Sequence, residues 1–178
     1  MQRFLFLWIC LFLTLSCSEE QDFDQADDLT LTPTVASSIF YFESDEPTIN
    51  LADNNAFYQE DFTFEAFNED FVAERVLDGV ITYQLENTTS KTLSLIVQFL
   101  TATGAVLDTE TFTVEAAPTA LLERQVAYGD GGKPLDILVN TRVIRLTAEN
   151  LGDATSVSSS PEPKIILRSS AAFGIQLR

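Results

Sequence analysis

The sequence predicts a mainly β domain, an antiparallel β-sandwich of about eight short strands with one or two short helices. One observation is that runs of alternating apolar and polar residues recur at roughly ten-residue spacing along most of the chain. Another is that clusters of Gly, Pro, Asn, Asp and Ser separate these runs, as turns require. The chain has 178 residues, which is enough for one domain with a sizeable core.

The first part of the predicted domain combines strands with a helix. Residues 29–35 alternate, but a proline among them limits this run to an edge strand or a linker. Residues 38–43 are aromatic and β-branched, which predicts a strand, and residues 44–55 predict a loop. Phenylalanines at strand spacing follow at residues 62–64, and then the period changes. Residues 69–75 predict a short helix, because an asparagine that can cap it comes just before two acids of a first turn.

The clearest β pattern lies in the middle of the chain. Apolar residues alternate with polar ones over residues 81–86, and again over residues 93–99. Residues 106–114 form a third, threonine-rich run, and Gly104 supplies the unusual dihedral of the turn before it. Because the links are short, these three runs predict an antiparallel meander.

The last part of the chain predicts further strands and a second helix. Residues 121–128 and 143–148 are strand-like. Residues 134–140 begin with a proline and place their apolar side chains on one helical face, which predicts a short helix. Residues 164–168 and 173–177 predict a hairpin that closes the domain.

Residues 1–16 predict an export signal. Their apolar run, residues 4–15, is too short to cross a bilayer, which takes about 20 residues. The sequence Thr-Leu-Ser-Cys that ends at Cys17 resembles the lipobox of bacterial lipoproteins. That resemblance implies that Cys17 is acylated and becomes the first residue of the mature chain, so that the membrane is a partner through an N-terminal lipid. The alternative is an ordinary cleaved signal in which Cys17 carries no lipid.

An acidic stretch follows the cysteine. Residues 17–28 contain six acids and no base, which predicts a flexible tether, and residues 29–178 then form the sandwich domain. Acids directly after an acylated cysteine resemble the surface-export signal of Bacteroidetes lipoproteins. The resemblance implies lipid anchoring in the outer membrane with the domain on the cell surface. The alternative is a plain spacer that leaves the domain at the periplasmic face.

Two segments of the domain carry a further resemblance. Residues 78–90 (Asp-Gly-Val-Ile-Thr-Tyr-Gln-Leu-Glu-Asn-Thr-Thr-Ser) and residues 97–108 look like immunoglobulin-like domains of bacterial envelope proteins. Thr101 departs from that pattern, which often has an acid there. With its leader and tether, the whole chain is similar to uncharacterised lipoproteins of flavobacteria. The resemblance implies an immunoglobulin-like sandwich in the cell envelope and implies no catalytic residues.

Charge and histidine content exclude several function classes. The net charge is −17, and residues 18–74 contain sixteen acids and no base. Such a field repels nucleic acid, so we expect no nucleic-acid partner. The chain has no histidine, which excludes Ser-His-Asp, Cys-His and His-zinc chemistry. We therefore expect no enzyme and no cofactor.

Two acidic clusters are candidate sites. Asp45, Glu46 and Asp53 are candidate calcium ligands, although their spacing matches no known calcium loop. The alternative is a solvated loop. The three acids of residues 69–74 could form the carboxylate pair of a glycoside hydrolase. The alternative there is that they stabilise the start of the predicted helix.

Aromatic residues are concentrated in the acidic half. Eight phenylalanines lie between Phe23 and Phe71, and most are expected in the core. Phe57 and Tyr58, beside the predicted loop, are the candidate ligand-binding residues. Exposed aromatic rings next to carboxylates would form a face for sugars or peptides.

These observations lead to two hypotheses of function. The first is a lipid-anchored cell-envelope protein that binds a partner protein or supports an assembly without catalysis. The alternative is a surface lipoprotein that binds glycans. Both require a sandwich with an exposed face, and the residue pattern does not choose between them.

Overall fold

The computed structural model describes residues 30–52, 56–117 and 120–177. Residues Leu31–Leu177 form one compact unit. A second unit comprises Met1–Thr30 and Arg178, and of it only Thr30 is described. The predicted export signal, Cys17 and the acidic tether therefore lie outside the described residues. No helix in the described part of the chain is long and apolar enough to cross a membrane.

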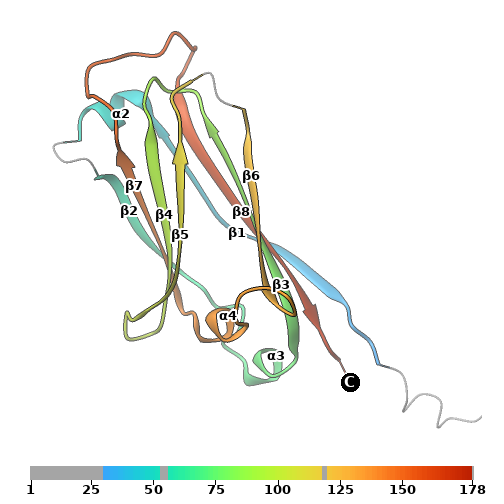
Figure 1. Cartoon of the computed structure of the whole chain (residues 1–178). Coiled ribbons are helices and arrows are strands. Elements are labelled where there is room, and N and C mark those ends of the chain that lie inside the picture. Colours follow the sequence, from blue (N-terminus) through green and yellow to red (C-terminus); the bar gives the residue numbers. More distant parts are fainter. Residues whose placement is uncertain (1–29, 53–55, 118–119, 178) are drawn as a thin grey trace, which may run out of the picture. The chain divides into compact units, whose positions relative to one another are not determined.

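Two four-stranded sheets make up the compact unit (Figure 1). In spatial order, sheet 1 contains β1 (Thr34–Asp45), β8 (Lys164–Ile175), β3 (Val76–Asn87) and β6 (Leu122–Gly129). Sheet 2 contains β2 (Ala56–Thr63), β7 (Val143–Asn150), β4 (Leu93–Leu100) and β5 (Val106–Val114). Every pair is antiparallel. The prediction of an antiparallel β-sandwich of about eight strands is confirmed.

The strand order refines this prediction. The sandwich has the two facing antiparallel sheets of an immunoglobulin-like domain, and its strands follow each other in the order of an eight-stranded jelly roll. Every connection crosses from one sheet to the other, except the hairpin between β4 and β5. Gly104 lies in the turn of that hairpin with a φ of 81°. The expected three-stranded meander is wrong. β4 and β5 form a hairpin, but β3 pairs with β6 and β8 and not with β4.

The expected hairpin at the end of the chain is also wrong. β8 is one continuous strand that pairs with β1 on one side and β3 on the other. The small residues Ser169–Ala172, which lie between the two predicted strands, continue β8. Ser169 and Ala171 are buried on the inner side of sheet 1, where larger neighbours surround them. Small side chains in a central strand thus reflect packing here and not a turn.

Three short helices are present among the described residues. α3 (Asp70–Ala73) and α4 (Asp136–Asn140) lie in the two segments predicted to be helical. α2 (Glu46–Asn50) lies in a segment predicted as a loop. It forms because Asp45 caps it: Thr48 N donates to Asp45 Oδ1 at 2.9 Å, and a proline stands in its first turn. In Figure 1, α2 lies at one end of the sandwich, and α3 and α4 lie at the other.

The core lies between the two sheets. Inward-facing residues of β3 and β4 alternate with outward ones, and the buried members include Ile81, Tyr83, Leu85, Leu93, Leu95, Val97 and Phe99. Phe40, Phe42, Phe64 and Phe67 are buried as well, so these four aromatic residues of the acidic half belong to the core, as expected.

Candidate functional site: an open groove beside strand β1

An apolar groove opens at the end of the sandwich that carries α3. Its volume is about 470 Å³. The lining consists of residues 35 and 37–39 of β1, residues 171, 173 and 175 of β8, and residues 63–67 and 72. We call this cavity the β1 groove. Its size and its mainly apolar lining are those of ligand-binding clefts in general.

The groove exists because sheet 2 does not cover this part of sheet 1. Val35 and Ser37 of β1 pair with Phe173 and Ala171 of β8, and these buried β8 residues place all four on the inner side of the sheet. β2 ends at Thr63, and the chain then turns away toward α3. The inner side of the first half of β1 is therefore left without a facing strand.

Three phenylalanines form the floor of the groove. The rings of Phe64 and Phe67 meet edge to face with centroids 5.9 Å apart, and those of Phe67 and Phe173 do so at 4.9 Å. All three side chains are buried. Edge-to-face pairs of this kind add to the packing energy, so the floor is preformed.

The wall of the groove is a free strand edge. β1 is the end strand of sheet 1, and no described strand pairs with its free edge, the edge that points away from β8. Residues 34–38 are exposed, and Val35 retains 50% of its surface. A register shift between Ser38 and Phe40 marks a β-bulge where the exposed half of β1 meets its buried half. An unpaired edge of this kind presents N–H and C=O groups that can pair with another chain.

One acidic residue lines the groove, and three more belong to the α3 segment beside it. Glu65 lines the groove, and Val72, which also lines it, lies in α3. Glu69 and Asp70 stand at the start of that short helix, and Glu74 at its end; all four acids are exposed. This arrangement places one acid, Glu65, and no base in the described lining of the groove. It does not pair the three acids of residues 69–74 across a cleft, as glycoside hydrolysis would require.

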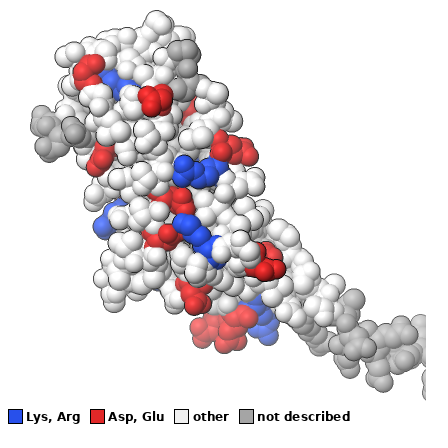
Figure 2. Space-filling view, in the orientation of Figure 1, with Lys and Arg blue, Asp and Glu red and all other residues white. Residues whose placement is uncertain are grey.

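The opposite edge of the sandwich is closed by ion pairs. Lys133 Nζ lies 2.6 Å from Asp108 Oδ2 and 2.5 Å from Glu110 Oε1, and Arg124 lies over the Phe112 ring at 4.3 Å. Burial alone would lower the pKa of Lys133, but its bonds to the two carboxylates outweigh burial, and the pKa is raised. Figure 2 shows basic side chains interspersed with acidic ones on the visible face. The charges of Lys133 and Arg124 are thus paired with carboxylates at this edge.

The candidate calcium ligands have structural partners. Asp45 caps α2, and Glu46 is buried, accepting hydrogen bonds from Ser90 N (2.6 Å), Ser90 Oγ (2.5 Å) and Ser158 N (2.8 Å). Burial raises the pKa of Glu46, but these hydrogen bonds outweigh it and leave the pKa below its ordinary value. Asp53 lies outside the described residues. The part of the chain that the structure describes contains no group of three or more acidic, His or Cys side chains placed to hold a metal.

A buried lysine, which no pattern in the sequence predicts, completes this network. Lys91 has no exposed surface, and its Nζ donates to Asp153 Oδ1, Ser156 O and Ser156 Oγ at 3.2, 2.8 and 2.6 Å. Ser156 Oγ also lies 3.0 Å from Ser90 Oγ, which joins the lysine to Glu46. The network ties three connections together at the α2 end. With two carboxylates nearby, the lysine holds the loops in place as a charged group.

Phe57 and Tyr58, the candidate ligand-binding residues, pack against the core. Their rings lie 6.4 and 4.3 Å from the Phe42 ring, centroid to centroid. The Tyr58 hydroxyl donates to Glu60. Burial and this bond raise the pKa of Tyr58 to about 12. Both side chains are half-buried, so neither projects freely toward a ligand.

The outer side of sheet 1 is a second candidate surface. Cross-strand register places Ser38, Ser170, Thr82 and Gln125 in one row. A row of small apolar residues, Ala36, Ala172, Val80 and Ala127, runs beside it. A shallow trough of about 500 Å³ covers most of these residues and has no charged side chain in its lining. On the other side of the polar row lie Tyr41, Arg168, Gln84 and Glu123, and Tyr41 is 52% exposed.

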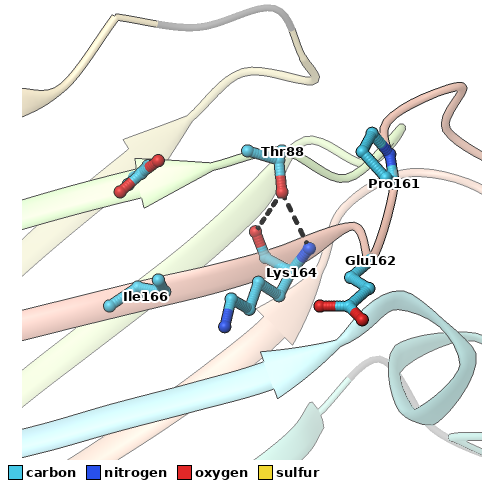
Figure 3. Close-up of a pocket in the computed structure, with 6 residues that line it drawn as sticks. Thr88, Pro161, Glu162, Lys164 and Ile166 are labelled. Atoms are coloured by element: carbon cyan, nitrogen blue, oxygen red, sulfur yellow. Dashed lines mark hydrogen bonds between the residues drawn. The ribbon is translucent and has the colours of Figure 1, made fainter.

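A small polar pocket lies farther along sheet 1, near the start of β8 (Figure 3). Its volume is about 190 Å³. Thr88 Oγ1 donates to Lys164 O at 3.0 Å and accepts from Lys164 N at 2.9 Å, which fixes one wall. Glu162, in another wall, has a φ of 53°. The pocket is too small and polar to match the β1 groove as a binding site.

Comparisons with known proteins identify no family. No family model matches the chain, and no curated protein matches it. Among solved structures, it is similar to VP2 of infectious bursal disease virus (TM-score 0.40, 11% identity), over 83% of this chain and 33% of that one. It is similar to a structure of Bacillus endospore appendages, described as disulfide-linked pili (0.38, 11%), over 82% and 91%.

A third similar structure is an arabinose-bound α-L-arabinofuranosidase (TM-score 0.39, 13% identity), over 84% of this chain and 24% of that one. The chain thus spans about a third of the viral protein and a quarter of the glycosidase. None of these similarities is close enough to transfer an activity to this chain.

Proposed function

We propose that this chain is a lipid-anchored cell-envelope protein that binds a partner protein through the β1 groove and performs no catalysis. The observation that carries the proposal is the preformed groove: an apolar floor, a free strand edge and the acidic side chain of Glu65 meet in one place. The lipobox-like leader and the acidic tether, similar to those of flavobacterial lipoproteins, support an anchor at Cys17 in the outer membrane. The same tether supports a location on the cell surface.

The anchor is tested by replacing the cysteine. Cys17→Ala should release the protein from the membrane fraction and abolish incorporation of labelled fatty acid. The chain offers a matched control, since Cys10→Ala changes a cysteine within the predicted signal and should leave both unchanged. Protease treatment of intact cells then reports the side of the membrane. Removal of the domain supports the cell surface, and survival until the outer membrane is opened supports the periplasmic face.

Partner binding is tested inside cells by site-specific photo-crosslinking. A photoreactive amino acid at Val35, in the groove, should give a discrete crosslinked product. The same amino acid at Val157, a 75% exposed residue of the β7–β8 connection, should not. Equal products from both positions, or none from Val35, would contradict binding through the groove.

A second candidate function is glycan binding on the outer side of sheet 1. The row of hydroxyl and amide side chains beside the apolar row matches the alternation of hydroxyl groups and C–H surface on a sugar ring. Tyr41 adds an exposed ring for stacking. Retardation in gels that contain neutral polysaccharide, lost in Tyr41→Ala and kept in Val157→Ala, would support this function. Absence of retardation with any neutral polysaccharide would count against it.

A further inference from the structure

We propose that the β1 groove takes an extended, net basic segment of the partner protein as an added strand, and that every second side chain of this segment is apolar. The inference rests on the proposed function and names its partner chemistry. It goes beyond that function because a groove can bind a helix, a loop or a lipid without strand addition.

The backbone of β1 supports strand addition. β1 is the last strand of sheet 1, and no described strand pairs with its free edge. Along their other edge, residues 34–38 pair with β8 in continuous antiparallel register, so their backbone is held in an extended conformation. An incoming segment can therefore continue the sheet through main-chain hydrogen bonds, as in other cases of β-augmentation.

The position of the cavity fixes the side-chain pattern. Side chains of an added strand alternate between the two sides of the sheet, about 6.6 to 6.8 Å apart on each side. On the inner side they would enter the groove and contact Phe64, Phe67 and Phe173. On the outer side they would face water beside β1. The segment therefore needs apolar residues at every second position, and polar residues between them.

Charge selects the partner. The described groove lining contains one acid, the exposed Glu65, and no base, and the whole chain carries a charge of −17. A lysine or arginine in the segment, placed to reach Glu65, complements this charge. The chain's own residues 18–28, with six acids and no base, would be repelled. A fatty-acid carboxylate would meet the same repulsion, so we assign a basic peptide segment.

The first experiment uses the full chain, purified from membranes in detergent. It is titrated with a short fluorescent peptide that alternates leucine with lysine, and anisotropy gives the affinity. N-methylation of one alternate set of peptide amides removes the bonds to β1, whereas methylation of the other set does not. We expect one set to weaken binding at least about tenfold, or about 1.4 kcal/mol, and the other to have little effect. Equal effects of both sets, or no binding, would overturn strand addition.

Variants of the protein locate the binding site. Ser37→Phe fills the groove from an exposed position and should weaken peptide binding at least about tenfold. Ser159→Phe is the matched control, because Ser159 is also exposed and lies in the β7–β8 connection. Glu65→Lys should weaken binding and reduce its salt dependence, while Glu162→Lys, with the same change in net charge, should not. Unchanged melting temperatures confirm that each variant is folded.

Other occupants give different results. Sedimentation that shows a dimer dissolved by Ser37→Phe would assign the groove to a second copy of this chain and overturn the proposal. Binding of a lysophospholipid that Ser37→Phe abolishes, without peptide binding, would also overturn it. If crosslinking at Val35 gives a product in cells but the peptide does not bind, the proposed partner binding is supported and the proposed strand addition is contradicted. If Val35 captures nothing, the proposed function itself fails.

Discussion

The ammonium group of Lys91 lies 3.2 Å from the carboxylate of Asp153, yet the two side chains have opposite surroundings. The lysine side chain has no exposed surface, whereas the aspartate side chain is 59% exposed. Backbone N–H groups of Thr155 and Ser156 also donate to the same Asp153 oxygen, at 2.7 and 2.6 Å. These bonds, with the lysine, hold the pKa of Asp153 far below its ordinary value. A buried cation is thus neutralised by an anion that remains hydrated.

Replacing Lys91 should destabilise the fold strongly. Lys91→Ala removes a fully buried stem and the donor to three acceptors, so we expect a loss of about 2 to 4 kcal/mol in the free energy of unfolding. Urea denaturation measures it. Lys91→Met keeps the stem and should recover part of the loss, which separates packing from charge. Asp153→Asn should cost less than Lys91→Ala, because the aspartate is hydrated; a larger loss would contradict this assignment.

Glu46 should make stability depend on pH in a defined direction. Its pKa is below the ordinary 4.5 in the folded state, so its stabilising effect is fully present above pH 4.5. The effect is lost as the pH falls through the lower, folded value. Glu46→Gln should therefore cost about 1 to 3 kcal/mol at pH 7, and the gap to the wild type should narrow below pH 4.5. Urea denaturation of both proteins across this range measures the gap; a gap that is constant with pH would contradict the assignment.

The sandwich could be predicted from the sequence because period-two alternation shows which side chains face the core. Ile81, Tyr83 and Leu85 alternate with polar residues, and the structure buries all three. The pairing order could not be predicted in the same way. Residues 88–92 form a connection short enough for a hairpin, but they cross to the other sheet. The alternation of apolar and polar residues predicts which side chains face the inside of the sandwich, but it does not predict which of the two sheets contains the strand.

The Lys91 network and the β1 groove were harder to predict. Lys91 follows Thr-Thr-Ser in a turn, where a lysine is expected to be exposed. Its burial depends on Asp153 and Ser156, which the fold brings from more than sixty positions away. The β1 groove likewise depends on where β2 ends relative to β1 and β8. Such relations arise from the assembled sheets and leave no local pattern of residues.

Salt should stabilise the protein through screening. Sixteen acids without a base occupy residues 18–74, and exposed charges interact over about 10 Å at 0.1 M salt. We expect the melting temperature to rise with NaCl and to rise equally with CaCl₂ at the same ionic strength. An extra rise with calcium that Asp45→Asn or Asp53→Asn removes would instead establish a calcium site.

Gly79 should be intolerant of a side chain because it supports the floor of the groove. A Cβ atom at this position would lie 2.8 Å from Phe173 Cδ1 and 3.0 Å from Leu138 Cδ1. Gly79→Ala should therefore displace the Phe173 ring, cost about 1 to 3 kcal/mol of unfolding free energy and weaken peptide binding in the groove.

Gly152→Ala provides the contrast for Gly79→Ala. A Cβ atom at position 152 meets nothing nearer than 3.4 Å. The alanine there should leave stability unchanged or raise it by about 0.4 to 1 kcal/mol, since the unfolded chain loses freedom. Thermal unfolding of the two variants side by side tests the assignment. Equal stability of the two variants would show that the Phe173 ring moves to make room for the added Cβ atom. A loss of stability in Gly79→Ala without a loss of peptide binding would show that Gly79 supports the core of the sandwich and not the floor of the groove.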